Sequence, residues 1–180
     1  MFDPENGSTT AGNSSQMIDG AAVILLTTHA QHLQLPILGI YRSFSVVGVP
    51  PSIMGIGPVV ASPKLLNDAG VSTKDAELYE ICEVLCPRRS TALRCLGVDG
   101  SKVNVNGGAI ALGHPLGCTG ARLTVSLLHE MKRRGVHNMG ENMEGGGGRR
   151  LGAVSMCIGT GMGDAALLDV EDEFWRHSSL

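Results

Sequence analysis

Residues Asn106–Arg122, NGGAIALGHPLGCTGAR, carry the clearest sequence indication of the fold and of the chemistry it supports. His114 stands between Gly113 and Pro115, in a run with almost no bulky side chains. Glycine is frequent where the backbone approaches a ligand closely or takes positive φ. We expect a helix to start just after this loop, where its first N–H groups can bind an anion or polarise a carbonyl. An imidazole there can deprotonate a thiol or stabilise an oxyanion, so His114 is a candidate catalytic residue.

A second small-residue segment, CIGTGMG at Cys157–Gly163, follows an apolar run. It puts the Cys157 thiol at the end of a predicted strand, where α/β proteins place their sites. The N–H of Gly159 lies two residues further on and is suited to an oxyanion hole. The segment is not a dinucleotide fingerprint, because Asp164–Val170 after it favours a strand rather than a helix. A thiol and an imidazole at two such places indicate thiol chemistry at one pocket.

The composition excludes several classes of function. The chain has 180 residues, enough for one domain, and 43% of them are apolar. Its net charge is −3 and no basic stripe alternates with aromatic residues, which excludes a nucleic-acid partner. No apolar run approaches the roughly 20 residues of a membrane-spanning helix. The five cysteines lack framework spacing and indicate reduced thiols in an intracellular compartment. Cys82, Cys86 and Cys95 do not have zinc-ligand spacing, so no metal is expected.

The predicted elements alternate between strands and helices, which favours an α/β fold. Strands are expected at Ile37–Val49, Ala76–Ile81, Leu151–Ile158 and Asp164–Val170. Helices are expected from Pro58 to a stop at Gly70, over His29–Leu35, over Cys82–Leu96 apart from a break at Pro87, and from Gly117 to a stop at Gly135. Asp19–Leu26 is apolar and fits either a strand or a buried helix, because periodicity does not separate the two. Residues 136–150 contain four consecutive glycines and are expected to be a loop.

Four segments of the chain resemble the thiolases, and among these the peroxisomal 3-ketoacyl-CoA thiolases. They are TAGNSSQMIDGAA at 10–22, VVGVPPSIMGIGP at 46–58, and the two small-residue segments around His114 and Cys157. The resemblance implies a thiolase-like fold, layered α/β/α around a mixed five-stranded sheet. In it, residues 1–36 end the amino-terminal domain and residues 37–180 form the carboxy-terminal domain. It also implies a homodimer and a peroxisomal location.

The reaction of the thiolases is a reversible Claisen condensation, which in its degradative direction belongs to fatty-acid β-oxidation. A nucleophilic cysteine attacks a 3-ketoacyl-CoA, acetyl-CoA leaves, and free CoA takes the shortened acyl group from the enzyme. By resemblance, His114 activates that cysteine and helps to form one oxyanion hole, while Cys157 is the acid/base at the acetyl α-carbon. Gly159 supplies a backbone N–H to a second oxyanion hole, and Ser15 contacts coenzyme A. Coenzyme A is a substrate, and no cofactor is implied.

Two departures from the family pattern bear on activity. No segment of this chain matches the motif of the nucleophilic cysteine, which lies in the first half of the family fold, so we expect an amino-terminal part to be missing. Where family members carry Asn-Glu-Ala-Phe, this chain reads Cys82-Glu83-Val84-Leu85. The asparagine holds a water in the oxyanion hole, whereas a thiol is a weak donor and acceptor.

The residues are compatible with three functions. We expect the carboxy-terminal part of a working thiolase, an acetyl-CoA C-acyltransferase, because His114 and Cys157 are both present. The alternative is a non-catalytic thiolase-like protein that binds CoA esters or an intact thiolase, which Cys82 and the unmatched nucleophile favour. A third hypothesis, an independent enzyme that uses Cys157 or Cys82 as its nucleophile, has the least support.

Overall fold

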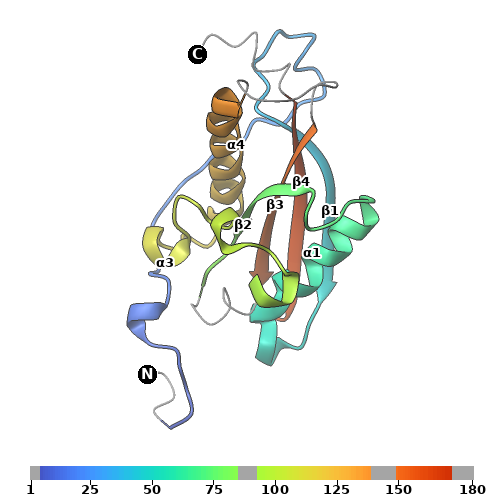
Figure 1. Ribbon diagram of the computed structural model, residues 1–180. Coiled ribbons are helices and arrows are strands. Elements are labelled where there is room, and N and C mark those ends of the chain that lie inside the picture. Colours follow the sequence, from blue (N-terminus) through green and yellow to red (C-terminus); the bar gives the residue numbers. More distant parts are fainter. Residues whose placement is uncertain (1–4, 85–92, 139–148, 172–180) are drawn as a thin grey trace.

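The computed structural model describes residues 5–84, 93–138 and 149–171, and its centre is a four-stranded sheet (Figure 1). The strands lie in the order β1-β4-β3-β2, with bounds β1 Ile40–Gly48, β2 Ala76–Ile81, β3 Arg149–Ile158 and β4 Met162–Glu171. β4 runs antiparallel to both of its neighbours, whereas β2 runs parallel to β3. The predicted mixed sheet is thereby confirmed. Beyond β2, a single parallel bridge joins Tyr79 to Val103, where a fifth strand would extend the sheet.

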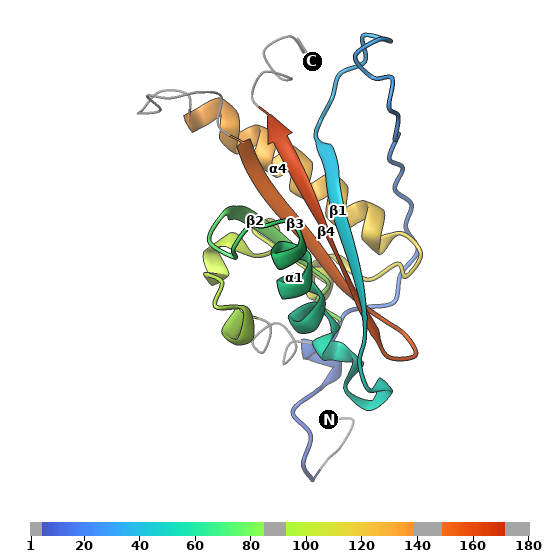
Figure 2. The ribbon, with the colours of Figure 1, turned by 90° about the vertical axis from the view of Figure 1, so that its right-hand side faces the viewer.

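Helices cover both faces of the sheet. α1 (Gly57–Asp68) packs on one face and α4 (Thr119–Asn138) on the other, as Figure 2 shows. The shorter helical segments are α3 (Ala109–Leu112), η1 (Ala11–Asn13), η2 (Pro51–Ile56) and η3 (Gly100–Lys102). The layered α/β/α arrangement is therefore confirmed. Among the described residues, no helix combines the length and the apolarity that crossing a membrane requires.

The core has two parts, because successive side chains of a strand point to opposite faces of the sheet. The cluster under α1 contains Leu65 of the helix together with Tyr79 of β2 and Leu167 of β4. The cluster under α4 contains Leu127 of that helix together with Leu78 of β2. Full burial of one such leucine side chain stabilises the fold by about 2 kcal/mol. Both helices are thus held to the sheet by apolar burial.

The predicted signals at the two ends of α1 are confirmed. Pro58 occupies the first turn, where its missing N–H leaves no helical bond unmade. Gly70, two residues past the helix, has a φ of 69°, a conformation that favours glycine. Gly57 and Gly163 let the start of α1 touch the start of β4, since a Cβ on Gly163 would lie 2.3 Å from the Gly57 carbonyl carbon. Any larger side chain there would displace the helix from the sheet.

α4 confirms the clearest helix of the sequence, with a correction at its end. It begins at Thr119, two residues after the predicted start, and continues through Gly135 to Asn138. The prediction that Gly135 stops the helix is wrong. A glycine within a helix costs only about 1 kcal/mol relative to alanine. The burial of the apolar face of α4 against the sheet outweighs that cost.

Two predictions before β1 are wrong. Asp19–Leu26 forms neither a strand nor a buried helix: it has no regular secondary structure, and Val23 is 88% exposed. The segment runs along the outside of the molecule, away from the hydrogen-bonded strands (Figure 2). His29–Leu35 forms a turn, closed by the Leu33 N–H donating to the His29 carbonyl, and not a helix. So short a segment does not sustain a helix by itself.

After β2 the chain does not enter the helix predicted from Cys82. The Cys82 N–H donates to the Ser155 carbonyl at 2.9 Å, which extends the ladder with β3 by one residue, and residues 82–84 are not helical. The backbone groups there are already paired with the neighbouring strand. Residues 93–96, at the far end of the predicted helix, are helical. Residues 85–92 with Pro87, and residues 139–148 of the predicted loop, lie outside the described residues.

Candidate active site

The candidate site lies at the carboxyl edge of β2 and β3. Because these two strands are parallel, their ends at Ile81 and Ile158 point to the same edge of the sheet. Cys82 follows β2 directly, and Cys157 is the next-to-last residue of β3. Ligand sites of α/β folds lie at such an edge. The topology therefore brings two cysteines from distant parts of the sequence to one end of the sheet.

His114 is held at this edge by its own loop and by the start of α4. Gly113 has a φ of 94°, and the His114 N–H donates to the Gln16 carbonyl at 2.8 Å. The Nδ1 atom of His114 lies 2.8 Å from Oγ1 of Thr119, whose hydroxyl donates to the Pro115 carbonyl at 3.1 Å. A hydroxyl has one hydrogen, so Thr119 accepts its bond from the Nδ1–H. The Nε2 atom of His114 is thereby left with its lone pair, ready to accept a proton.

The surroundings of His114 keep its imidazole neutral. Burial, and then the nearby Arg122 guanidinium, hold the pKa of His114 below its ordinary value. Desolvation disfavours the charged imidazolium, and a neighbouring cation repels it. At neutral pH the side chain is therefore a base and not a fixed positive charge. This is the protonation state that activation of a thiol requires.

Cys82 packs directly against His114. Its Sγ atom lies 3.9 Å from Nδ1 of the imidazole, and the residue is buried. Cys82 differs from the residue that the thiolase pattern has at this position. In the structure it lies beside His114, the candidate base. A thiol binds water and oxyanions weakly, so this position supplies less hydrogen bonding than an amide would.

Ser15 belongs to the same network through its backbone. The Ser15 N–H donates to the Val84 carbonyl at 2.9 Å, and the next residue, Gln16, accepts from the His114 N–H. The segment with Ser15 thus bridges the residues after β2 and the loop of His114. Of the predicted site residues, Ser15, His114 and the departing Cys82 are brought together by these bonds.

Cys157 and Gly159 stand at the turn between β3 and β4. Cys157 is half-buried and pairs with Gly163, while Gly159 is exposed. The turn needs left-handed backbone at Gly161, whose φ is 99°, and a Cβ there would lie 2.4 Å from the Val49 carbonyl oxygen. The strand of Cys157 packs against the start of α4, because a Cβ on Gly120 would lie 3.0 Å from the Met156 methyl carbon. Met156 thus faces α4, and the next residue of β3, Cys157, points to the other face of the sheet.

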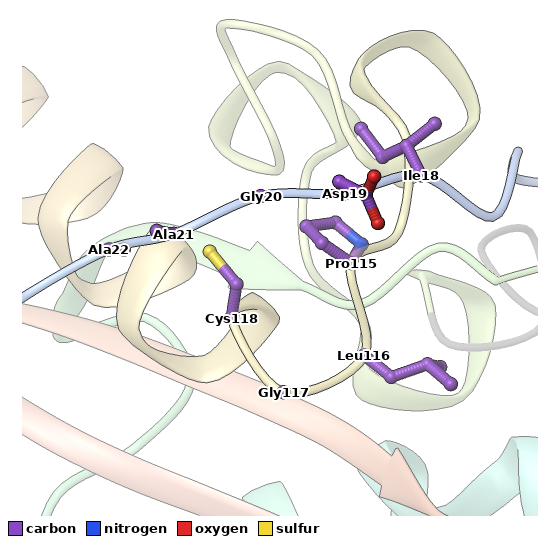
Figure 3. Close-up of a pocket in the computed structure, with 9 residues that line it drawn as sticks. All are labelled: Ile18, Asp19, Gly20, Ala21, Ala22, Pro115, Leu116, Gly117 and Cys118. Atoms are coloured by element: carbon purple, nitrogen blue, oxygen red, sulfur yellow. The ribbon is translucent and has the colours of Figure 1, made fainter.

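A pocket of about 300 Å³ opens beside the loop of His114 (Figure 3). It lies between two segments and is lined by Ile18, Asp19, Gly20, Ala21, Ala22, Pro115, Leu116, Gly117 and Cys118. Pro115 and Gly20 make its narrowest part, since a Cβ on Gly20 would lie 2.7 Å from Cγ of Pro115. The thiol of the buried Cys118 points toward the segment of Gly20 and Ala21 (Figure 3). The pocket begins at Pro115, the residue after His114, and His114 itself is not among its lining residues.

Sequence reasoning missed Thr119, Arg122 and Glu80 as parts of this site. Thr119 lies in the quoted glycine-rich stretch, where a hydroxyl at the helix start was available as a signal. Glu80 is a carboxylate in an otherwise apolar half of β2, and its burial to 2% exposure is the anomaly that could have singled it out. The contacts of these residues depend on how α4 packs on β2, and no local sequence pattern predicts that packing.

Fold and site together define an α/β protein with an imidazole and a thiol at the carboxyl edge of parallel strands. Residues 35–170 match the family described as "Thiolase, C-terminal domain". The chain is 53% identical over 167 residues to the peroxisomal 3-ketoacyl-CoA thiolase B of Rattus norvegicus, covering 92% of this chain and 37% of that protein. The chain belongs to the thiolase family.

Two solved structures have the same fold. The dimeric peroxisomal thiolase of Saccharomyces cerevisiae is 40% identical, with a TM-score of 0.76 over 95% of this chain and 40% of that chain. Human mitochondrial 3-ketoacyl-CoA thiolase in complex with CoA is 39% identical, with a TM-score of 0.77 over 94% of this chain and 40% of that chain. The chain thus spans well under half the length of the relatives it matches, and the match is to their carboxy-terminal domain.

Proposed function

We propose that this chain supplies the acid/base half of a thiolase site, for the cleavage of a 3-ketoacyl-CoA by CoA to acetyl-CoA and a shortened acyl-CoA. The observation that carries the proposal is the orientation of His114. Its neutral imidazole is fixed through Thr119 with Nε2 free to accept a proton, at the edge of the sheet where β3 ends in Cys157. The 53% identity to a 3-ketoacyl-CoA thiolase supports the choice of reaction.

In the proposed reaction, Nε2 of His114 removes a proton from the attacking thiol. That thiol comes from the portion of the relatives that this chain does not span. The thiolate adds to the 3-keto carbon, the bond between C2 and C3 breaks, and its electron pair forms the enolate of acetyl-CoA. Cys157 donates a proton to that enolate, whose oxygen the Gly159 N–H stabilises. Cys157, now deprotonated, takes the proton of CoA, and the CoA thiolate attacks the acyl-enzyme thioester. The enzyme thiolate leaves and regains its proton from His114, which releases the shortened acyl-CoA.

Substrate, assembly and location follow from the same relatives. Ser15 is proposed to contact coenzyme A, which the human mitochondrial relative binds in its solved structure. A homodimer is proposed because the yeast relative is dimeric, and a peroxisomal location because the rat relative is named peroxisomal. Coenzyme A enters as a substrate, and no cofactor is proposed.

Two measurements test the proposal on the protein isolated from its source. The first is thiolysis of a 3-ketoacyl-CoA in the presence of CoA. The second is exchange of the α-protons of acetyl-CoA in D₂O, followed by mass spectrometry, which requires Cys157 and an oxyanion hole but no attacking thiol. We expect both activities, and loss of both in Cys157→Ala. A protein that binds CoA esters in calorimetry but shows neither activity would be the non-catalytic thiolase-like binder, and the proposal would fail.

A further inference from the structure

A buried ion pair lies next to the network of His114. Nη1 of Arg122, in the first turns of α4, lies 3.2 Å from Oε2 of Glu80 on β2. The side chains are 17% and 3% exposed. Taking two charges out of water is costly, and an apolar pair of similar volume would join β2 to α4 without that cost. The pair therefore suggests a role beyond holding the helix to the sheet.

The pair and the His114 network form two adjacent layers between β2 and α4. Glu80 and Cys82 are alternate residues and point to the same face of the sheet. Thr119 and Arg122 are three residues apart and share one face of the helix. The outer layer is Cys82–His114–Thr119, and the inner layer is Glu80–Arg122. The guanidinium is thus one layer away from the imidazole and acts on it electrostatically.

Arg122 and the carboxylates around the two layers shift the pKa values of their neighbours in opposite directions. Arg122 lowers the pKa of His114, while burial raises the pKa of Glu80 to about 7 against the opposing effect of Arg122. Glu83, after β2, and Glu130, on α4, raise the pKa of Glu80 further. Among the residues that line the pocket beside the His114 loop, Asp19 is the charged one.

Within the described residues, Nη2 of Arg122 is buried without a hydrogen-bond partner. Glu80 is the carboxylate that the structure pairs with this guanidinium. The net charge behind His114 consequently depends on whether Glu80 is ionised. An ionised Glu80 neutralises Arg122, and a protonated Glu80 leaves a full cation there.

We propose that Arg122 and Glu80 are positioning residues for His114: Arg122 keeps the imidazole unprotonated, and Glu80 sets how much of the Arg122 charge reaches it. As pH falls toward 7, Glu80 takes up a proton, the cation loses its counter-charge, and the imidazole resists protonation more strongly. His114 therefore stays a base over a wider pH range than an isolated histidine. The catalytic consequence rests on the proposed thiolase reaction, whereas the protonation of His114 does not.

The test is an NMR titration of the His114 ring in the full chain, with His114→Asn used to assign its signals. Arg122→Gln should raise the affinity of His114 for a proton, because a nearby cation is removed. Glu80→Gln should lower that affinity by less than Arg122→Gln raises it, because Glu80 is already largely protonated in the pH range where His114 takes up its proton. Arg122→Lys keeps the charge and should titrate like the wild type. Thermal unfolding of each variant shows that it is folded.

The matched control is Glu77→Gln, which removes the carboxylate of another Glu–Arg pair, with Arg150, at the opposite end of β2. It should leave the titration of His114 unchanged. Shifts of opposite sign in Glu80→Gln and Arg122→Gln support the proposal. Shifts in the same direction, no shift in either, or an equal shift in Glu77→Gln would overturn it. If the titrations shift as expected but thiolysis and exchange are absent in the wild type, only the proposed function fails.

Discussion

The two faces of the sheet are built for different purposes. Under α1 the core is mainly apolar, as with Leu65 packed on Tyr79 and Leu167, and its buried polar groups are the uncharged hydroxyls of Ser45 and Ser62. Under α4 the core starts in the same way but gives way, toward the carboxyl edge, to a buried polar layer that includes Glu80 and Arg122. Apolar burial provides stability, whereas buried charges and a fixed imidazole lower it in exchange for chemistry. The His114 network therefore lies on the α4 face, whereas Cys157, which follows the α4-facing Met156, points to the other face of the sheet.

The largest expected effect concerns the site itself. His114→Ala and Cys157→Ala should each lower thiolysis by about 10²- to 10⁴-fold, the contribution typical of a positioned acid or base. Both residues are only half-buried, so the variants should keep the wild-type fold and unfolding temperature. Steady-state thiolysis assays and thermal unfolding measure the two effects. A near wild-type rate in either variant would contradict the role assigned to that residue.

On the opposite face, Leu65→Ala should affect stability and not chemistry. The side chain is 1% exposed in the cluster under α1, and such truncations cost about 2–5 kcal/mol. Urea denaturation should show this loss, while the NMR titration of His114 should match that of the wild type. A shift in the pKa of His114 as large as that of Arg122→Gln would show that the two faces are not independent.

Thr119→Val tests the link between the imidazole and α4. The valine matches the threonine in shape but cannot accept the bond from Nδ1–H of His114, and a buried group left unsatisfied costs about 1–3 kcal/mol. Imidazole ¹⁵N shifts should then show the proton moving to Nε2, and thiolysis should fall, because Nε2 can no longer accept the proton of the attacking thiol. Thr119→Ser keeps the hydroxyl and serves as the control. Unchanged ¹⁵N shifts in the valine variant would rule out this hydrogen bond as the cause of the orientation.

The smallest expected effect is on the pH dependence of stability. The folded pKa of Glu80 is raised to about 7, so the folded state binds the proton more tightly than the unfolded state does. Its contribution is fully present below the unfolded pKa and is lost as pH rises through 7. Glu80→Gln should remove this slope. Urea denaturation between pH 4 and 8 checks it, and an equal slope in the variant would refute the assignment.

Local signals predicted most of the sheet and its helices. Ala76–Ile81 is predicted as a strand and is β2 over the same residues. The end of α4 was missed because glycine was expected to stop it, although packing on the sheet carries the helix past Gly135. The prediction for Asp19–Leu26 is wrong because an apolar run is buried only where another apolar surface of the protein packs against it. Secondary structure was therefore predictable where the neighbours in space are also neighbours in sequence.

The site was predictable in part. Glycine context pointed to His114 and Cys157, and the structure places both at one edge of the sheet; their catalytic roles, and those of Gly159 and Ser15, stay predictions. Thr119 and the Glu80–Arg122 pair were not predictable, because they depend on the docking of α4 onto β2. Glu80 and Arg122 are 42 residues apart, and no periodicity joins residues so distant.

The parallel pairing of β2 with β3 has a consequence for how the chain folds. The β3–β4 hairpin with Cys157 closes over a short loop, whereas the β2–β3 pair joins residues as far apart as Glu77 and Arg150, 73 positions along the chain. Closing the longer loop costs more entropy, and such non-local contacts form late. A folding intermediate would therefore hold the thiol of Cys157 in a formed hairpin while Cys82 is still undocked from the strand. Cys157 and Cys82 therefore come to one edge of the sheet only when the non-local β2–β3 pairing has formed.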